Sequence, residues 1–122
     1  MQARASGILL PVFSLPGPYG IGSLGKSARQ FINFLSDGKQ KFWQILPLVP
    51  PGGGDSPYMS PSSFAGNPLL LDLELLQEEG LLTQDELNSA RWNNPDRVDY
   101  VWLHQTRLPL LRKAWDRGRQ AY

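Results

Sequence analysis

Apolar residues form two short runs near the N-terminus, and a helical pattern lies between them. Residues 7–13 and 41–47 are apolar at most positions, which is typical of strands covered on both faces in a parallel sheet. Pro11 predicts that the first strand ends early or bends. Residues 26–37 carry Ala28, Phe31, Ile32 and Leu35 on one helical stripe. Strand, helix and strand in this order predict a right-handed βαβ unit.

The pattern is lost after the second strand, over residues 52–68. This segment is longer than most connections, and such loops are generally functional or disordered. Tyr58 and Phe64 argue against disorder, because flexible linkers rarely carry large apolar side chains. Polar side chains of the loop are Asp55, Ser56, Tyr58, Ser60, Ser62, Ser63 and Asn67. Hydroxyls beside aromatic rings suit a sugar, so we predict a structured binding loop at the carboxyl end of a parallel strand.

Beyond the loop the pattern is helical. Asp72 can cap a short helix over residues 73–79, and a capping-box spacing opens a second helix over residues 84–91. Asp99 can cap a longer helix, which Pro109 is expected to kink or break. The expected apolar anchors of that helix are Val101, Leu103, Leu108, Leu111 and Trp115.

Composition adds limits on function. A net charge of +1 gives no reason to expect nucleic acid. The basic residues near the end, Arg107, Arg112, Lys113, Arg117 and Arg119, are interrupted by Asp116 and favour a solvated helix face. The lack of cysteine excludes thiol catalysis and suits a reducing compartment, the cytoplasm. No segment is long and apolar enough to predict a membrane span.

The predicted sheet is incomplete. Two parallel strands have faces and edges that need cover, and the last helical pattern runs to the end of the sequence without a stop signal. We therefore expect the N-terminal part of a larger α/β protein.

Four motifs follow one another along the chain: RASGILL at residues 4–10, SLPGPYGIG at 14–22, WQILPL at 43–48 and GDSPYMSPSSFAGNPLLLDL at 54–73. In this order they resemble the N-terminus of the 4-α-glucanotransferases of glycoside hydrolase family 77, also called amylomaltases or disproportionating enzymes. A weaker match, RVDY, lies at residues 97–100.

The resemblance implies a (β/α)8 TIM barrel of which this chain is the N-terminal portion. Residues 1–50 would be the first βαβ unit of the barrel, residues 51–71 a long substrate-binding loop, and residues 72–122 a helical inserted segment that ends before the catalytic strands. The remainder of the barrel would be the partner of this chain.

The resemblance also implies the chemistry, which is transfer of α-1,4-glucan segments between maltodextrin chains with retention. Such chemistry needs a carboxylate nucleophile and a carboxylic acid/base. Family members carry both on later strands, so we expect no catalytic residue, cofactor or metal site in this chain and no activity of the chain alone. Maltooligosaccharides and α-1,4-glucans are the expected ligands. The alternative is a stand-alone or truncated glucan-binding module without catalysis.

The resemblance suggests substrate-binding residues within the loop. Ser56 and Tyr58 match family positions that line the donor subsites, although Tyr58 could instead anchor the loop. For Asp55, Ser60 and Asn67, sugar contact and loop scaffolding are equally open, and Asp55 is expected to accept loop N–H groups rather than take part in chemistry. Among the other aromatic residues, Phe64 is expected to pack and Trp43 to lie in the core. Gly53 and His104 replace aromatics with which some members hold a second glucan chain, so that accessory site should be lacking.

Overall fold

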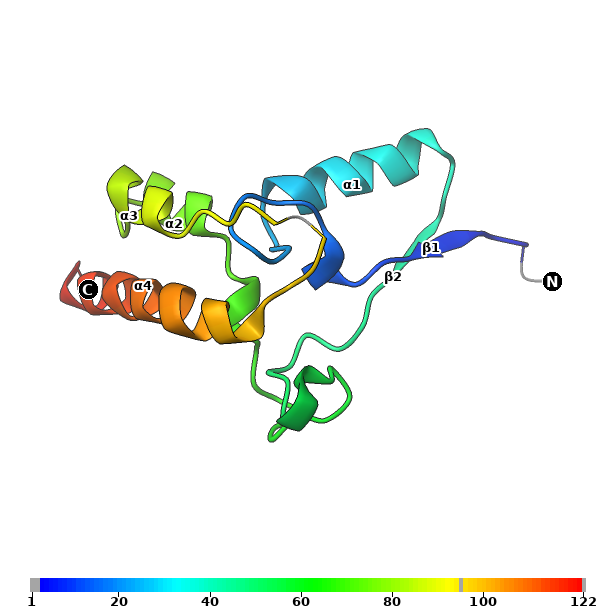
Figure 1. Cartoon of the computed structure of the whole chain (residues 1–122). Coiled ribbons are helices and arrows are strands. Elements are labelled where there is room, and N and C mark those ends of the chain that lie inside the picture. The colour runs from blue at the N-terminus through cyan, green and yellow to red at the C-terminus, as the bar shows by residue number, and fades with distance from the viewer. Residues whose placement is uncertain (1–2, 95, 122) are drawn as a thin grey trace.

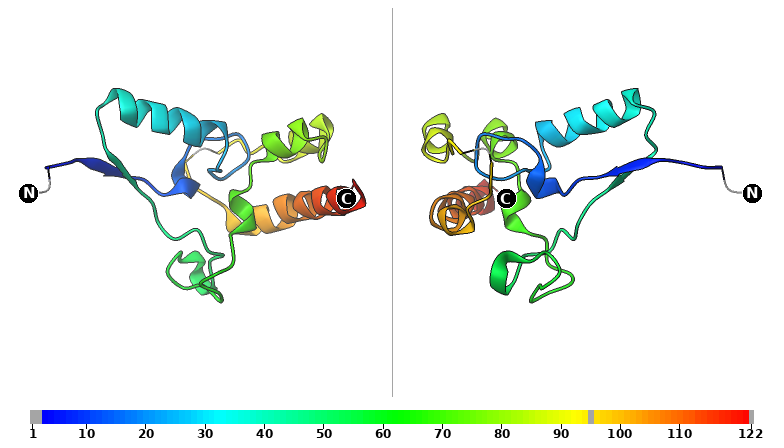
Figure 2. Two further views of the ribbon diagram at one scale, coloured as in Figure 1. Left: turned by 180° about the vertical axis from the view of Figure 1, so that it is seen from behind. Right: turned by 45° about the vertical axis from the view of Figure 1, so that its right-hand side comes forward.

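The fold is that of a computed structural model, which describes residues 3–94 and 96–121. It joins a two-stranded sheet covered by one helix to a group of three helices (Figure 1). In Figure 1, β1 and the last turns of α4 lie at opposite ends of the molecule, and the long loop projects to one side of it in all three views (Figures 1 and 2).

The predicted βαβ unit is confirmed. It consists of β1 (Gly7–Leu9), α1 (Lys26–Asp37) and β2 (Phe42–Gln44), and the two strands pair in parallel. β1 ends before Pro11 and is followed by a 3-10 turn, η1 (Val12–Ser14), so the early end predicted at the proline is also confirmed.

The burial predicted for these strands is wrong for the described residues. Ile8, Leu9 and Phe42 are 41%, 55% and 63% exposed, because no strand other than β1 and β2 lies among residues 3–94 and 96–121. Trp43 is half-buried: its ring meets Phe31 edge-on at 5.0 Å between centroids, and its indole N–H donates to a backbone carbonyl oxygen.

The three predicted helix starts after the loop are confirmed. Asp72 caps α2 (Leu73–Glu78) by accepting from a backbone N–H, and Thr83 and Glu86 form a reciprocal capping box at α3 (Gln84–Ser89). Asp99 accepts the N–H of Trp102 at 3.0 Å in the first turn of α4 (Tyr100–Ala121). Local side-chain chemistry therefore sets where each helix begins.

The longest helix differs from its prediction. α4 continues through Pro109 without a break, and its buried stripe is Leu103, Arg107, Leu110 and Ala114. The expected anchors Val101 and Trp115 are 69% and 64% exposed. Arg107 was predicted on a solvated face but is 1% exposed, because it falls in helical register with the apolar residues.

Two apolar clusters hold the chain together. The first joins the turn after β1, α1, the end of the loop and the start of α4, with Val12, Leu15, Ile21, Ala28, Leu69, Leu70 and Leu103 buried. The second joins α2, α3 and the rest of α4, with Tyr19, Leu73, Leu82, Leu87, Ala90, Leu110 and Ala114 buried. Residues 69–70 belong to η3 (Pro68–Leu70), so the end of the loop is part of the first cluster. Within the described ranges, no helix is both long and apolar enough to cross a membrane.

Candidate functional site

The long loop is closed at its base. The N–H of Asn67 donates to the carbonyl oxygen of Leu48 at 2.8 Å, which brings the two ends of the loop together. Within the loop, the N–H of Gly52 donates to the carbonyl oxygen of Met59. Because β1 and β2 are parallel, this loop and the turn after β1 leave the same end of the sheet. That end carries the binding sites of open α/β sheets and barrels.

Small polar side chains shape the loop from within. The hydroxyl oxygen of Ser56 accepts the N–H of Tyr58 at 3.3 Å. The hydroxyl of Ser60 donates to the carbonyl oxygen of Ser62 at 2.8 Å and accepts the N–H of the same residue. The side-chain oxygen of Asn67 accepts the N–H of Leu69 at 3.0 Å and caps η3. Ser56, Ser60 and Asn67 therefore have scaffolding roles, while their contact with a sugar stays a prediction.

The aromatic side chains of the loop point into solvent. Tyr58 is 72% exposed and Phe64 is 100% exposed. Phe64 therefore does not pack against any described residue, contrary to the expectation. Tyr58 does not anchor the loop within the described residues either. Its backbone is fixed by Ser56 while its ring is free, which is the state that a stacking contact with a sugar needs.

Asp55 ends η2 (Gly53–Asp55) in a left-handed backbone conformation, with φ of 56°. Aspartate tolerates this conformation better than most residues. Its own N–H donates to the carbonyl oxygen of Gly52 at 3.3 Å. Among the described residues, no loop N–H donates to the Asp55 carboxylate, so the role predicted for it is not found. The side chain instead lines a cavity.

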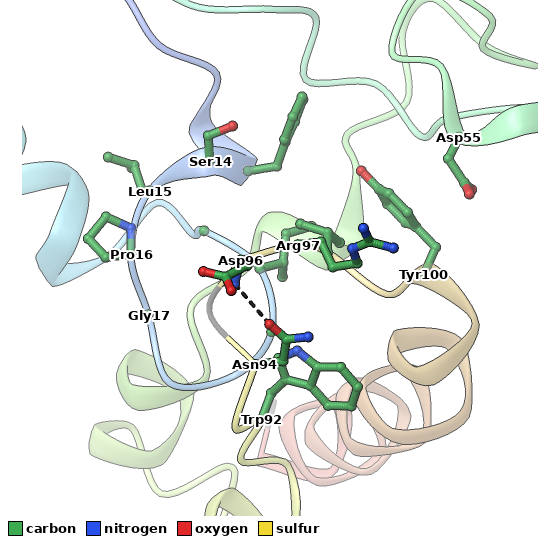
Figure 3. A pocket seen from close by; sticks show the side chains of 15 residues that line it. Ser14, Leu15, Pro16, Gly17, Asp55, Trp92, Asn94, Asp96, Arg97 and Tyr100 are labelled. Carbon is green, nitrogen blue, oxygen red and sulfur yellow. Dashed lines mark hydrogen bonds between the residues drawn. The ribbon is translucent and has the colours of Figure 1, made fainter.

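That cavity has a volume of about 560 Å³ and lies between the turn after β1, the segment before α4 and the first turn of α4. Figure 3 shows Asp55 and Tyr100 on one side of it, facing Ser14, Leu15 and Pro16 on the other. Its size is in the range of small-molecule sites. Further polar or aromatic side chains that line it are Phe13, Trp92, Asn94, Asp96 and Arg97.

Tyr100 and Trp92 are, with Phe13, the aromatic residues that line the cavity. Burial raises the pKa of the Tyr100 phenol, and the nearby carboxylate of Asp55 raises it further, so the hydroxyl stays protonated and can donate a hydrogen bond. The Trp92 ring lies 4.5 Å from that of Trp102, between centroids. Neither Trp92 nor Tyr100 was predicted from the sequence to line a site. The weak RVDY match, which includes Tyr100, was the available signal.

Two further predictions concern groups outside the cavity. In the part of the chain that the structure describes, no three histidine, cysteine, aspartate or glutamate side chains gather as metal ligands would. Gly53 and His104 are both exposed, and a Cβ added at Gly53 would meet no atom within 4 Å. The space at Gly53, where the resemblance implies that an aromatic side chain has been replaced, is therefore empty of other atoms.

The comparisons with known proteins cover nearly the whole chain. Residues 10–122 match the model of glycoside hydrolase family 77, described as 4-alpha-glucanotransferase. The chain belongs to this family. The 4-alpha-glucanotransferases of Aquifex aeolicus, Streptococcus pneumoniae and Thermus thermophilus are 52%, 49% and 47% identical to it over 96%, 93% and 92% of its length.

A solved member of the family gives the same result in three dimensions. The amylomaltase from Streptococcus agalactiae, in complex with acarbose, is 47% identical and superposes with a TM-score of 0.88 over 93% of this chain. The chain spans 23% of that amylomaltase and 22% to 24% of the three relatives. The loop and the cavity both lie within the matched residues.

Proposed function

We propose that the complete protein containing this chain transfers α-1,4-glucan segments between maltodextrin chains with retention. Membership of family 77 is the observation that carries the proposal. The chain covers only 23% of the relative from Streptococcus pneumoniae, but it is 49% identical to that relative over the covered part. A structured loop with a free tyrosine at the carboxyl ends of two parallel strands supports it.

The architecture in this proposal is a (β/α)8 barrel. Residues 1–50 form its first βαβ unit, residues 51–71 its substrate loop and residues 72–122 an inserted helical segment. The remainder of the barrel is the partner that covers β1 and β2. The exposed apolar side chains of both strands support this, since parallel sheets are normally covered on both faces.

In the same proposal the loop contributes donor-side contacts to the maltooligosaccharide. Tyr58 stacks on a glucose ring, and Ser56 holds the Tyr58 backbone and reaches the substrate. Asp55 contacts the substrate from the rim of the cavity, and Ser60 and Asn67 maintain the conformation of the loop. The acid/base and the nucleophile come from later strands, because retaining transfer needs two carboxyl groups about 5–5.5 Å apart. The proposed location is the cytoplasm, because the lack of cysteine suits a reducing compartment.

The test uses the complete gene product and the 122-residue chain in parallel. Each is incubated with maltotriose, and glucose and longer maltodextrins are measured against a buffer control. The complete protein should produce both, and the short chain should produce neither. Transfer by the short chain would contradict the proposal, and so would inactivity of a folded complete protein.

The alternative is a glucan-binding module without catalysis. It predicts that the short chain binds maltodextrins and that no longer protein containing it transfers glucan. Calorimetry of the short chain with maltoheptaose, together with the incubation above, separates the two functions.

A further inference from the structure

One arginine is buried where a leucine would fit the pattern. Arg107 occupies the apolar stripe of α4 between Leu103 and Leu110, and it is 1% exposed. Burial lowers the pKa of its guanidinium to about 10, against the opposing effects of Asp72 and Tyr19, so it stays charged at neutral pH. No ion pair joins it to a carboxylate among the described residues. A buried charge without such a pair is costly.

The partner of this arginine is a backbone group. Its Nη2 donates to the carbonyl oxygen of Leu71, while Nε and Nη1 have no hydrogen-bond partner in the part of the chain that is described. A charged donor strengthens a hydrogen bond to a carbonyl oxygen. The side chain therefore fixes Leu71 with a strong interaction that no apolar residue could replace.

Leu71 lies where the long loop ends and α2 begins. The preceding residue, Leu70, accepts the N–H of Leu24 at 3.0 Å through its carbonyl oxygen. The following residue, Asp72, accepts the hydroxyl of Ser23 at 2.5 Å. Asp72 also lies against Gly25, where an added Cβ would come within 2.0 Å of a carboxylate oxygen. The turn before α1 thus holds residues 70 and 72, and α4 holds residue 71.

The loop is anchored to the rest of the chain at this base and not at its tip. Leu69 and Leu70 are buried, whereas Tyr58, Met59 and Phe64 are at least 63% exposed. The hydrogen bonds of the serines in the tip stay within the loop itself. A small rotation at the base would move the whole tip, because the segment between is braced internally.

We propose that Arg107 is a positioning residue for the substrate loop: its hydrogen bond to Leu71 sets the orientation in which the loop meets a glucan. This inference rests on the proposed function for its effect on catalysis. The effect on the loop itself does not depend on that function.

A matched control lies ten residues further along the same helix. Arg117 also donates to a backbone carbonyl oxygen, that of Leu81, at 2.9 Å. Its side chain is 42% exposed, and it forms an ion pair with Glu86. Arg117 contacts the start of α3 and not the loop, so removal of its side chain should not change substrate binding.

The experiment compares Arg107→Met, Arg107→Lys and Arg117→Met in the complete protein, at a temperature where thermal unfolding shows each to be folded. For Arg107→Met we expect the KM for maltotriose to rise about tenfold, which corresponds to one hydrogen bond of about 1.4 kcal/mol. Arg107→Lys, which keeps the charge and can still donate a hydrogen bond, should recover most of this. Arg117→Met should leave KM unchanged. A purely structural role would lower the active fraction and leave KM as it was.

Hydrogen exchange gives a readout independent of activity. Amides of residues 67–72 should exchange faster in Arg107→Met, and those of residues 81–86 in Arg117→Met. Unchanged exchange at residues 67–72 in folded Arg107→Met would overturn the inference, as would an equal rise of KM in both methionine variants. If Arg107→Met does not fold, Arg107→Gln, which is neutral and shorter, replaces it in both measurements. If the unmodified protein is inactive, only the proposed function is contradicted. The hydrogen-exchange comparison still tests the inference about Arg107.

Discussion

The helices α2, α3 and α4 bury apolar side chains within this chain, whereas the apolar side chains of the strands are largely exposed. Leu73, Leu87 and Leu103, on three helices, are at most 2% exposed and are buried by other parts of the same chain. Leu9 and Phe42, on the two strands, are more than half exposed. The helical segment therefore closes its own core, while the strands present a surface for other residues to cover.

Backbone groups follow the same division. Each of the helices α2, α3 and α4 has its first turn capped by its own Asp72, Thr83 or Asp99. β1 and β2 pair only with each other among the described residues, so each leaves one edge without a partner strand. Open parallel edges are rare in native proteins. We therefore expect the helices to contribute to the free energy of unfolding both in the 122-residue chain and in the complete protein. The strands should contribute to it only in the complete protein.

The largest expected effect tests the helical core. Leu103→Ala should lower the free energy of unfolding of the complete protein by about 2–5 kcal/mol, because it leaves a cavity at a side chain with no exposure. Val101→Ala, on the exposed side of the same helix, should cost less than about 0.5 kcal/mol. Urea denaturation measures both. Equal losses would show that the two faces of α4 do not differ as described.

A second prediction concerns the loop, where exposure is expected to serve binding. Tyr58→Ala should lower kcat/KM for maltotriose by an amount equivalent to about 1–3 kcal/mol, through loss of one sugar contact in a closed site. Its unfolding free energy should hardly change, since the ring is 72% exposed. Met59→Ala, at a neighbour that is also mostly exposed, is the control. If the two variants have the same kcat/KM as the unmodified protein, Tyr58 is only part of the loop surface.

A smaller effect is expected where α3 begins. Thr83→Ala removes the side chain that accepts the N–H of Glu86 and should destabilise the protein by about 1 kcal/mol. Thr83→Ser keeps the accepting hydroxyl and should stay close to the unmodified protein. Thermal unfolding distinguishes them, and a serine variant as unstable as the alanine variant would argue against the cap.

The smallest effect appears at acid pH. Hydrogen bonds from Arg117, and then from the Thr83 backbone, lower the pKa of Glu86 from 4.5 to about 2. The folded state therefore gains stability from this carboxylate above pH 4.5, and loses it as the pH falls from 4.5 towards 2. Glu86→Gln should remove that part of the pH dependence. The check is the unfolding midpoint at pH 6 and pH 3 for both proteins, and an unchanged difference between the two pH values would contradict the assignment.

Short-range features of this fold could be predicted from the sequence. The caps Asp72, Thr83 and Asp99 each accept an N–H group three residues further along the chain, so their spacing alone locates the helix starts. The burial of Ile8 and Phe42 could not be predicted in the same way, because it depends on which other segments are present.

The errors in the site have a spatial cause. The cavity gathers side chains from three distant segments, so neither Trp92 nor Tyr100 stands out along the chain. Arg107 was assigned to a charged face by counting basic residues, although its spacing from Leu103 and Leu110 places it on the buried stripe. Phe64 was expected to pack because it is large and apolar, and no described residue meets it.

The central claim is that β1 and β2 await cover from the rest of a family 77 barrel, whereas the helical segment does not. Hydrogen exchange of the 122-residue chain and of the complete protein tests it most directly. We expect the amides of β1 and β2 to be strongly protected only in the complete protein, and those in the middle of α4, around Leu110, to be protected in both. Strand amides equally protected in the short chain would contradict the claim, and so would an α4 that gains its protection only in the complete protein.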